Sequence, residues 1–336
     1  SPRQNRMSTD NALTVVVLLP SAEWPGLEAK PPLPAGQMHF GTSVEDFDPT
    51  ILKQAGGVLW VPPASEETLK TLHAALPCCR WVHSFSAGLD SIAGFVRSLS
   101  ENTHVSNGRG AFSSSLAEFA MTAMLHFNKQ IPRCQQNRKT RTWDKFVMNT
   151  VRGKTLGLLG YGSIGKATAA LGAAFGMNII VLRRNPGKVE ERGSPQPQKT
   201  YGFADAEAFY KAADFVVCSL PATAETKHFV SKAAFDAMGP QTVFISLGRG
   251  AVVDEKALHA ALRSNAISGA ALDVFEKEPL PHDSPLWDDE KLLLTAHNAD
   301  LTEDYFKLGW DTFVRNAESI RASGQPATEV DKMAGY

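Results

Sequence analysis

Short, continuous apolar runs alternate along this chain with segments of helical composition. The runs are rich in Val, Ile and Leu and are bounded by Pro, Gly or Asp, which is typical of strands buried on both faces of a parallel sheet. In the first hundred residues they occupy residues 13–19, 56–61 and 80–85. The stretch from residue 20 to 41 is rich in Pro and Gly and predicts a loop.

Helical segments separate these runs. Residues 65–75 begin with Ser and carry two acids in the first turn, which favours a helix start. Residues 105–110 predict a strand end and a loop, after which Ser113, Ser114 and Ser115 can cap a long helix over 116–129. The basic, polar stretch from residue 129 to 143 predicts a solvated surface arm or an oligomer contact.

The same alternation continues through the second half. Apolar runs predict strands at 155–159, 178–182, 214–220, 241–247, 270–275 and 292–295. Helices are expected at 166–175, 204–213, 232–238, 255–264 and 304–322, and a loop at 187–201. Strands alternating with helices predict an α/β fold with two doubly wound parallel sheets. Because 336 residues exceed the usual single core, we expect two domains.

A glycine motif follows the run at 155–159. Gly160, Gly162 and Gly165 form G-x-G-x-x-G between a predicted strand and a predicted helix, and a second strand completes a βαβ unit. The first glycine permits the turn, the second lets the backbone approach a pyrophosphate, and the third lets helix and strand pack closely. The helix N-terminus adds N–H groups that attract phosphate. The motif therefore predicts a Rossmann dinucleotide-binding domain.

The end of the second strand predicts which dinucleotide is bound. NAD sites place an acid there to accept hydrogen bonds from the ribose, but this strand ends in Arg183 and Arg184. Two guanidiniums suit a 2′-phosphate, which favours NADP(H), with NAD(H) possible. A solvated basic strand end is the alternative interpretation.

Composition limits which kinds of partner we expect for this protein. A net charge of -1 gives no reason to expect nucleic acid or an anionic membrane as a partner, and no apolar run approaches the length of a membrane span. The four cysteines lack metal-ligand spacing, so we expect no metal and a reducing, cytoplasmic compartment. Residues 1–6 are expected to be an expression remnant and Met7 a possible start.

Three polar residues follow predicted strands of the second half, where ligands of open α/β sheets bind: Arg249, Glu278 and His297. Hydride added to a 2-keto carbon leaves an alkoxide that needs a proton, and histidine titrates near neutrality. A carboxylate partner fixes the imidazole ring, and a guanidinium matches a substrate carboxylate through two parallel hydrogen bonds.

The segments SLGRGAVVDEKALHAAL, GAALDVFEKEPLP and LLLTAHNAD, in this order after the glycine motif, resemble the D-isomer-specific 2-hydroxyacid dehydrogenase family. The resemblance covers nearly the whole chain from Leu13. The segments WVPP at 60–63 and FSAGLD at 85–90, with the closing residues 330–336, are similar to its glyoxylate/hydroxypyruvate reductase branch.

The resemblance implies an NADPH-dependent reductase of small 2-keto acids, to D-2-hydroxy acids. Arg249 would bind the substrate carboxylate, His297 would donate the proton and Glu278 would hold His297. The residues implied at the cofactor are Gly160, Tyr161, Gly162, Ser163, Ile164, Arg183, Arg184, Ser219, Leu220, Pro221, Thr226, Leu247, Gly248 and Asp273. Those implied at the substrate are Ser86, Ala87 and Gly88, by their backbone N–H groups, with Arg249 and Trp60.

Some assignments carry alternatives. Asp273 holds the nicotinamide amide or only satisfies local backbone, and Trp60 is a pocket wall or a core residue. The resemblance also implies a flavodoxin-like substrate domain (1–114 and 300–336), a Rossmann domain (115–299) and a homodimer joined through the Rossmann halves. The domains are expected to close over the substrate, with hinges near Ser115 and Ala299.

The chain departs from the family pattern near the predicted proton donor. Ala296 replaces the usual Pro before His297, and Asn298 and Asp300 stand where small residues are common. Arg109 appears where a proline is usual, and it either contacts substrate or has a structural role. Two other functions fit the motifs: a nucleotide-sensing corepressor on the same fold and, less well with Arg183 and Arg184, an NAD-linked oxidant of an inorganic or one-carbon acid.

Overall fold

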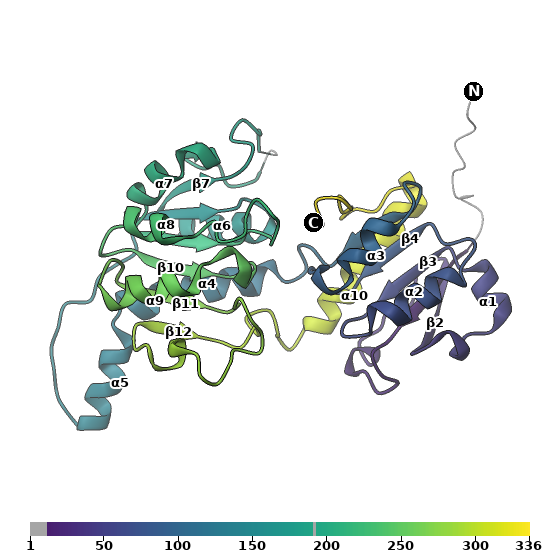
Figure 1. Cartoon of the computed structure of the whole chain (residues 1–336), viewed down its shortest axis with the longest axis horizontal. Helices are drawn as coiled ribbons and strands as arrows, with labels where there is room; N and C mark the ends of the chain where they lie inside the picture. Colours follow the sequence, from purple (N-terminus) through teal and green to yellow (C-terminus); the bar gives the residue numbers. More distant parts are fainter. Residues whose placement is uncertain (1–11, 191–192) are drawn as a thin grey trace. The chain divides into compact units, whose positions relative to one another are not determined.

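The computed structural model describes residues 12–190 and 193–336; the expectations for residues 1–6 and Met7 lie outside these ranges. The chain forms two compact units (Figure 1). Unit 1 comprises Ser1–Phe112 and Glu303–Tyr336, and unit 2 comprises Ser113–Thr302. Each unit is built on its own sheet, so the predicted class of two parallel-sheet α/β domains is confirmed.

Unit 1 has a five-stranded parallel sheet in the order β2-β1-β3-β4-β5. This is the flavodoxin-like strand order. Its strands are β1 Leu13–Leu18, β2 Gly36–Gly41, β3 Gly57–Trp60, β4 Trp81–Ser84 and β5 His104–Asn107. Its helices are α1 Pro49–Gln54, α2 Glu66–Ala74, α3 Ala93–Ser98 and α10 Tyr305–Ser323, with 3-10 helices at Pro25–Leu27, Val44–Asp46 and Asp90–Ile92.

Unit 2 has a seven-stranded parallel sheet in the order β12-β11-β10-β9-β6-β7-β8. Read from β8, this is the Rossmann order with one strand added. Its strands are β6 Thr155–Leu159, β7 Asn178–Leu182, β8 Lys199–Tyr201, β9 Phe215–Cys218, β10 Val243–Ser246, β11 Gly269–Leu272 and β12 Leu292–Leu294.

Helices cover both faces of this second sheet (Figure 1). The covering helices are α4 Ser113–Asn128, α6 Ser163–Ala174, α7 Ala206–Ala212, α8 Lys232–Ala237 and α9 Glu255–Arg263, whereas α5 Ile131–Thr140 extends away from the sheet. Further 3-10 helices lie at Phe203–Asp205, Gly250–Val252 and Pro285–Asp288.

Two predicted loops were wrong at their C-terminal ends. The last residues of the loop over 20–41 form β2, and the last residues of the loop over 187–201 form β8. Both are edge strands, whose pairing partner on one side supplies most of their stability. The segment GQMHFG is mostly half-buried and lacks the apolar run used to predict central strands.

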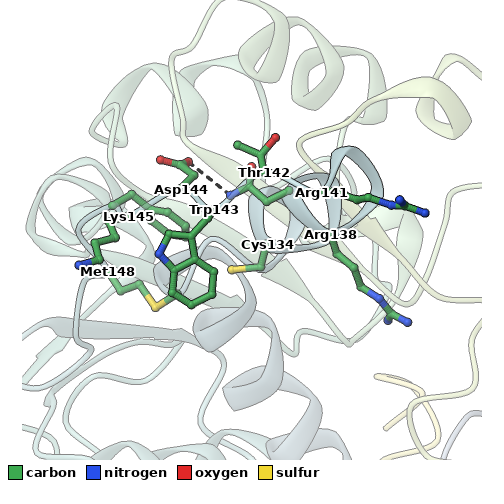
Figure 2. Close-up of a pocket in the computed structure, with 10 residues that line it drawn as sticks. Cys134, Arg138, Arg141, Thr142, Trp143, Asp144, Lys145 and Met148 are labelled. Carbon is green, nitrogen blue, oxygen red and sulfur yellow. Dashed lines mark hydrogen bonds between the residues drawn. The ribbon is translucent and has the colours of Figure 1, made fainter.

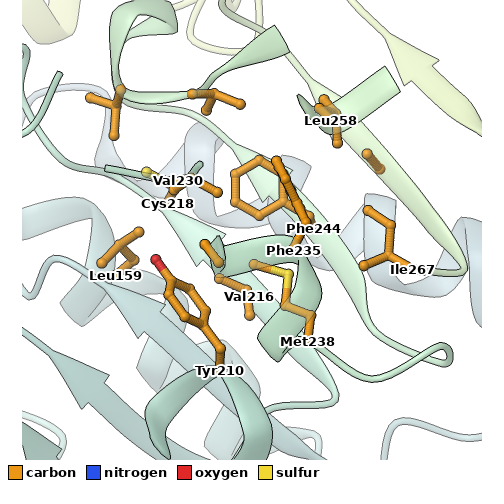
Figure 3. Packing of buried hydrophobic residues seen from close by; sticks show 14 of the residues in the cluster. Leu159, Tyr210, Val216, Cys218, Val230, Phe235, Met238, Phe244, Leu258 and Ile267 are labelled. Carbon is orange, nitrogen blue, oxygen red and sulfur yellow. The ribbon is translucent and has the colours of Figure 1, made fainter. Parts of the chain in front are cut away.

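Buried side chains form separate cores on the two faces of each sheet. In unit 2, one core packs α7, α8 and α9 against the sheet through Phe235, Phe244, Leu258 and Ile267, among others (Figure 3). In unit 1, one core gathers aromatic rings beneath α10, where Trp81 and Phe313 stack with ring centroids 5.4 Å apart. Helix α10 therefore completes the core of unit 1 although it lies at the end of the chain.

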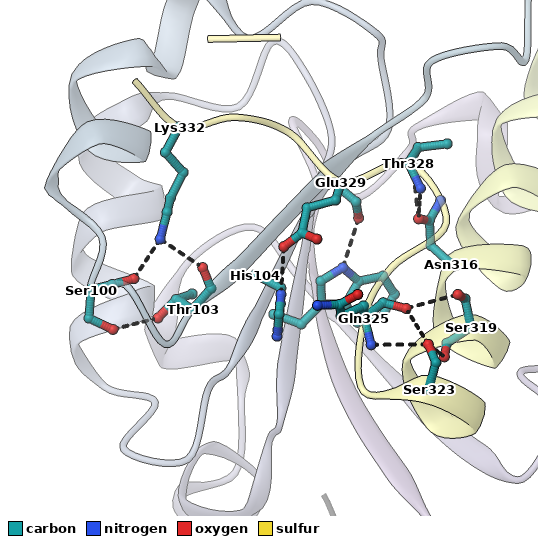
Figure 4. A network of polar contacts seen from close by, with 12 residues as sticks. Ser100, Thr103, His104, Asn316, Ser319, Ser323, Gln325, Thr328, Glu329 and Lys332 are labelled. Carbon is teal, nitrogen blue, oxygen red and sulfur yellow. Dashed lines mark hydrogen bonds and ion pairs between the residues drawn. The ribbon is translucent and has the colours of Figure 1, made fainter. Parts of the chain in front are cut away.

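The C-terminal segment binds along edge strand β5 (Figure 4). Glu329 makes an antiparallel bridge to Ser106, and its Oε1 lies 2.7 Å from His104 Nδ1. Lys332 donates to the carbonyls of Ser100 and Thr103 at 2.7 and 3.1 Å. Arg109 donates to the Glu329 carbonyl at 3.0 Å. Of its two interpretations, substrate contact and structural role, this bond fits the structural one. The segment thus covers a sheet edge that would otherwise expose backbone groups.

His83 is a buried histidine that the fold keeps neutral. Its ring is fully buried on β4, and Nδ1 lies 2.7 Å from Ser106 Oγ. Burial lowers the pKa of His83 to about 3, and the charge of Arg315 acts in the same direction. The unfolded chain protonates this histidine near its ordinary value of 6.5. Its contribution to stability is therefore complete above pH 6.5 and is lost as pH falls towards 3.

We predict that acid destabilises unit 1 through this histidine. Between pH 8 and pH 5, protonation of His83 in the unfolded chain should lower the free energy of unfolding by about 2 kcal/mol. Urea unfolding followed by the buried tryptophans of unit 1 measures this change at both values. The pH-dependent loss should be smaller by that amount in His83→Gln, whatever that variant costs at pH 8. Equal losses in both proteins would contradict the prediction.

Candidate active site

The residues predicted to act on a ligand in unit 2 share one edge of its sheet. All seven strands are parallel, so their carboxyl ends lie at the same edge. Gly160 follows β6, Ser219 follows β9, Arg249 follows β10, Asp273 follows β11 and His297 follows β12. The strand order reverses between β6 and β9, and such a switch point is where open α/β sheets bind ligands.

The glycine motif forms the turn that its spacing predicts. Gly160 has a φ of 96°, which a side chain would strain, and Cβ on Gly165 would lie 2.5 Å from the Gly160 carbonyl oxygen. Gly162 is the N-cap residue of α6, and a Cβ there would meet nothing within 4 Å. The turn therefore leaves open space before the N-terminus of α6, which fits a pyrophosphate.

The neighbouring strand ends pack closely against this turn. A Cβ on Gly248 would lie 2.3 Å from the Leu220 carbonyl oxygen, so the loops after β9 and β10 touch through backbone. Thr226 is 2% exposed, and its hydroxyl donates to the Pro221 carbonyl at 2.6 Å. Thr226 thus shapes the loop after β9 from within, while Leu220 and Leu247 are also buried.

An acid from the loop after β7 lies against the two cations near the end of that strand, which the sequence did not reveal. Arg183 forms an ion pair with Glu190, and Lys166 Nζ lies 2.9 Å from the other Glu190 oxygen. Burial raises the pKa of Glu190, but the two cations outweigh burial and hold it below the ordinary value. The strand end itself has no acid, as its sequence states, and Glu190 reaches it from the following loop, where spacing gives no signal.

His297 and Glu278 form a hydrogen-bonded pair. His297 Nδ1 donates to Glu278 Oε2 at 2.6 Å, and the other oxygen of Glu278 accepts from the Phe275 N–H at 2.9 Å. Because a carboxylate only accepts, the proton lies on Nδ1 and Nε2 is left to exchange a proton with a ligand. The structure thus brings together two of the three predicted catalytic side chains.

Asp273 fixes the loop that carries His297. Its carboxylate is 1% exposed and accepts from the Thr295 hydroxyl at 2.7 Å and from the N–H groups of Asn298 and Ala299 at 3.0 and 3.2 Å. These contacts match the interpretation that Asp273 satisfies local backbone. His297 itself has a φ of 51°, a conformation that residues with a side chain rarely adopt.

Arg249 and Asp300 set the charge of this edge. Arg249 is half-buried, and its Nη1 donates to the Gly248 carbonyl at 2.9 Å. Burial raises the pKa of Asp300, Asp273 adds to the rise, and the charges of His297 and Arg249 oppose it. Asp300, which stands where the family commonly has a small residue, therefore interacts electrostatically with the predicted acid-base residue His297.

Two acids that the sequence analysis did not single out, Glu255 and Glu276, support the loop of Glu278. Glu276 Oε1 accepts from the Glu255 N–H at 2.9 Å, and Glu255 Oε1 accepts from the Glu276 N–H at 2.5 Å. His228 Nε2 lies 3.1 Å from the second oxygen of Glu276. Burial raises the pKa of Glu255, and the charges of Glu276 and Glu278 raise it further. The pair ties the start of α9 to the segment that leads to Glu278.

The predicted anion-binding turn of unit 1 has its carbonyls engaged. The Ser86 carbonyl accepts from the Gly108 N–H at 3.0 Å, and the Ala87 carbonyl accepts from Asn107 at 2.6 Å. The Gly88 carbonyl accepts from the Ser86 hydroxyl at 3.0 Å. An anion would bind to the backbone N–H groups of residues 86–88, and these carbonyl contacts hold the turn in shape.

Trp60 lies in the core of unit 1. It is 1% exposed, packs in the cluster with Leu69 and Leu72, and donates its indole N–H to the Ala64 carbonyl at 2.8 Å. This burial corrects the expectation of a pocket wall, because a side chain without exposed surface cannot contact a substrate.

Comparison with known proteins identifies the family. Residues 121–299 match the family model described as "D-isomer specific 2-hydroxyacid dehydrogenase, NAD binding domain". The chain belongs to this family. Among its relatives is the glyoxylate/hydroxypyruvate reductase B of Enterobacter sp. (strain 638), 37% identical over 202 residues. That alignment covers 58% of this chain and spans 60% of the relative's length.

Two solved structures of the family resemble the whole chain. A D-isomer specific 2-hydroxyacid dehydrogenase from Xanthobacter autotrophicus Py2, in complex with NADPH and MES, has a TM-score of 0.79 and 26% identity, covering 97% of this chain and all of the other. An NADPH-dependent glyoxylate/hydroxypyruvate reductase from Sinorhizobium meliloti, in complex with NADP and sulfate, has a TM-score of 0.78 and 25% identity, covering 96% of this chain and all of the other.

Residues 12–190 and 193–336 contain neither a membrane-spanning helix nor a cluster of metal ligands. None of the helices there has the length and apolar content to pass through a bilayer. In the same part of the chain, no group of three or more His, Cys, Asp or Glu side chains is placed to hold a metal ion.

The open space at Gly162 leads to a prediction about nucleotide binding. Gly162→Ala should unfold within about 0.5 kcal/mol of the unchanged protein, because its φ of -83° suits alanine and nothing lies within 4 Å. The methyl group would stand where backbone must approach the pyrophosphate, so the Kd for NADPH should rise at least about tenfold. Isothermal titration calorimetry and thermal unfolding measure the two effects.

Gly239→Ala is the matched control for this prediction. A Cβ at Gly239 meets only Thr242 Oγ1 at 3.7 Å, and the residue lies outside the glycine turn, so neither stability nor affinity should change. If Gly162→Ala binds NADPH as tightly as Gly239→Ala does, the glycine turn is not the pyrophosphate site.

Proposed function

We propose that this protein is an NADPH-preferring reductase that converts small 2-keto acids, of the glyoxylate and hydroxypyruvate type, to D-2-hydroxy acids. The observation that carries the proposal is the hydrogen bond of 2.6 Å between His297, on the loop that follows β12, and Glu278, on the segment between β11 and β12. Arg249 follows β10 on the same sheet edge, and the glycine turn follows β6. An acid-base group, a carboxylate-binding cation and a nucleotide turn thus share one edge.

The chemistry of the chain's own residues fits this reduction. Bound NADPH would supply the hydride that adds to the 2-keto carbon. Arg249 would bind the substrate carboxylate and draw electron density from the adjacent carbonyl. His297 Nε2 would give its proton to the oxygen as negative charge develops there. Glu278 would hold the ring by Nδ1 and stabilise the imidazolium before proton transfer.

The rest of the site would hold the two ligands. The N–H groups of residues 86–88 would bind the substrate carboxylate from unit 1, and closure of the units would exclude water. Residues 160–164 would bind the pyrophosphate, Ser219 to Pro221 and Thr226 would line the adenosine-ribose and phosphate path, and the Leu247 carbonyl would accept from the nicotinamide amide. We keep Asp273 as a candidate for the nicotinamide amide, although its carboxylate already binds the loop of His297.

NADP preference is supported by the cations at the end of β7. Arg183 and Arg184 follow that strand, and Lys166 reaches the same cluster. The relatives from Xanthobacter and Sinorhizobium were solved with NADPH and NADP. Glu190 and Glu225, which pairs with Arg184, leave one net positive charge in the cluster, which still favours a phosphate over a hydroxyl.

Steady-state reduction of glyoxylate, hydroxypyruvate, pyruvate and an aromatic 2-keto acid, each with NADPH and NADH, tests the proposal. We expect kcat/KM to be highest with glyoxylate or hydroxypyruvate and at least about tenfold higher with NADPH. His297→Ala and Glu278→Gln should lower kcat by about 100-fold or more, because the first removes the proton donor and the second removes the carboxylate that holds it, and both should leave the Kd for NADPH within about twofold.

His228→Gln is the control. This histidine also lies against a carboxylate, that of Glu276, but it is not predicted to donate a proton to the substrate. It should retain most of kcat. Tight NADPH binding without reduction of any acid in the panel would favour the nucleotide-sensing corepressor, and a higher kcat/KM with NADH would remove the NADP assignment.

We further propose that the protein forms a homodimer through the arm that follows α4. Helix α5 and the segment up to residue 150 extend away from the sheet of unit 2 (Figure 1). Trp143 is 91% exposed and Val147 80%, beside a shallow groove of about 510 Å³ that Cys134 and Met148 help to line (Figure 2). Such clustered apolar exposure marks an interaction surface, and a second copy offers the same arm in return.

Charge on this arm should separate the dimer. Trp143→Glu combined with Val147→Glu is expected to shift the solution mass from twice the chain mass towards the single chain, because two buried carboxylates would be costly. Sedimentation equilibrium or light scattering measures this mass. Met333→Glu, at an apolar residue of unit 1 that is 77% exposed, should leave it unchanged. A single-chain mass for the unchanged protein would refute the dimer.

A further inference from the structure

Glu190 is the most deeply buried member of the charged cluster at the end of β7. Its side chain is 3% exposed, whereas those of its partners Arg183 and Lys166 are 12% and 28% exposed. The three come from different segments: Arg183 from the end of β7, Lys166 from the first turns of α6, and Glu190 from the loop between β7 and β8. A carboxylate so buried is stable only because both cations hold it.

The loop that carries Glu190 is attached to the same place by other contacts. Arg183 also donates to the Lys188 carbonyl, and Tyr161 of the glycine motif donates its hydroxyl to the Pro195 carbonyl at 2.6 Å. The Arg183 guanidinium lies 6.0 Å from the Tyr161 ring centroid, and burial raises the pKa of Tyr161 to about 12. The Arg183 Nε atom is buried without a hydrogen-bond partner.

We propose that Glu190 is an internal anion that competes with the 2′-phosphate of NADP(H) for Arg183 and Lys166, and so sets the strength of cofactor discrimination. This inference rests on the proposed function, because it assigns the two cations to the 2′-phosphate. A carboxylate and a phosphate bind guanidinium through the same pair of N–H groups. Both anions cannot use the same donors, so the phosphate must displace Glu190 or bind beside it against repulsion.

NAD(H) places a hydroxyl at the same position. A hydroxyl carries no charge and can donate to a carboxylate, so Glu190 does not oppose it. Glu190 therefore weakens the binding of the phosphorylated cofactor selectively, and the chain tolerates both cofactors better than its two arginines alone predict.

The test removes the charge of Glu190 and keeps its shape. Glu190→Gln should bind adenosine 2′,5′-bisphosphate about tenfold more tightly than the unchanged protein, and 5′-AMP within about twofold. Isothermal titration calorimetry measures both, and thermal unfolding checks that the variant is folded. In an Arg183→Met background the gain should shrink, because the removed carboxylate then frees only Lys166.

Glu207→Gln provides the matched control. It removes one carboxylate of unit 2 that pairs only on the surface with Lys211, so both nucleotide affinities should stay unchanged. An unchanged or weaker affinity of Glu190→Gln for the bisphosphate overturns the inference. The unchanged protein's preference between NADPH and NADH is a separate measurement: preference for NADH would overturn the NADP assignment, while a gain in Glu190→Gln would still support Glu190 as the competing anion.

Discussion

The proposed acid-base site of this protein depends on one buried carboxylate. Asp273 directly follows β11 and accepts hydrogen bonds from the loop that follows the next strand, at Thr295, Asn298 and Ala299. These contacts bracket His297, whose positive φ costs about 1 to 3 kcal/mol and persists only where the surroundings enforce it. Because Asp273 lies at the edge of the sheet, its hydrogen bonds fix the backbone on both sides of His297 relative to the sheet.

This arrangement explains why His297 can be exposed and still be held in place. Its side chain is 44% exposed, which a proton donor to a ligand requires, and an exposed side chain ordinarily samples several rotamers. The backbone is fixed by Asp273 and the ring by Glu278, which is itself anchored by the Phe275 N–H. The Glu255–Glu276 pair then secures the segment before Glu278.

The sequence predicted what depends on local pattern and failed where distant segments meet. The central strands and the glycine turn follow from apolar runs and from backbone geometry that only glycine adopts, as at Gly160. The edge strands β2 and β8 were missed because their pairing, and not their composition, makes them strands. Glu190 was missed for a similar reason. It lies in a loop without a regular sequence pattern, and its spacing from Arg183 along the chain does not predict that the two side chains meet.

The same reasoning explains why the strained loop needs a second anchor. The chain leaves unit 2 at Thr302, soon after His297, and enters it at Ser113. Ser115 Oγ donates to the Ala299 carbonyl at 2.5 Å, so the entering and leaving segments are tied together within unit 2. Ala299 receives this bond at its carbonyl and gives its N–H to Asp273. The two bonds at Ala299 therefore hold the backbone that follows His297, one through its carbonyl and one through its N–H.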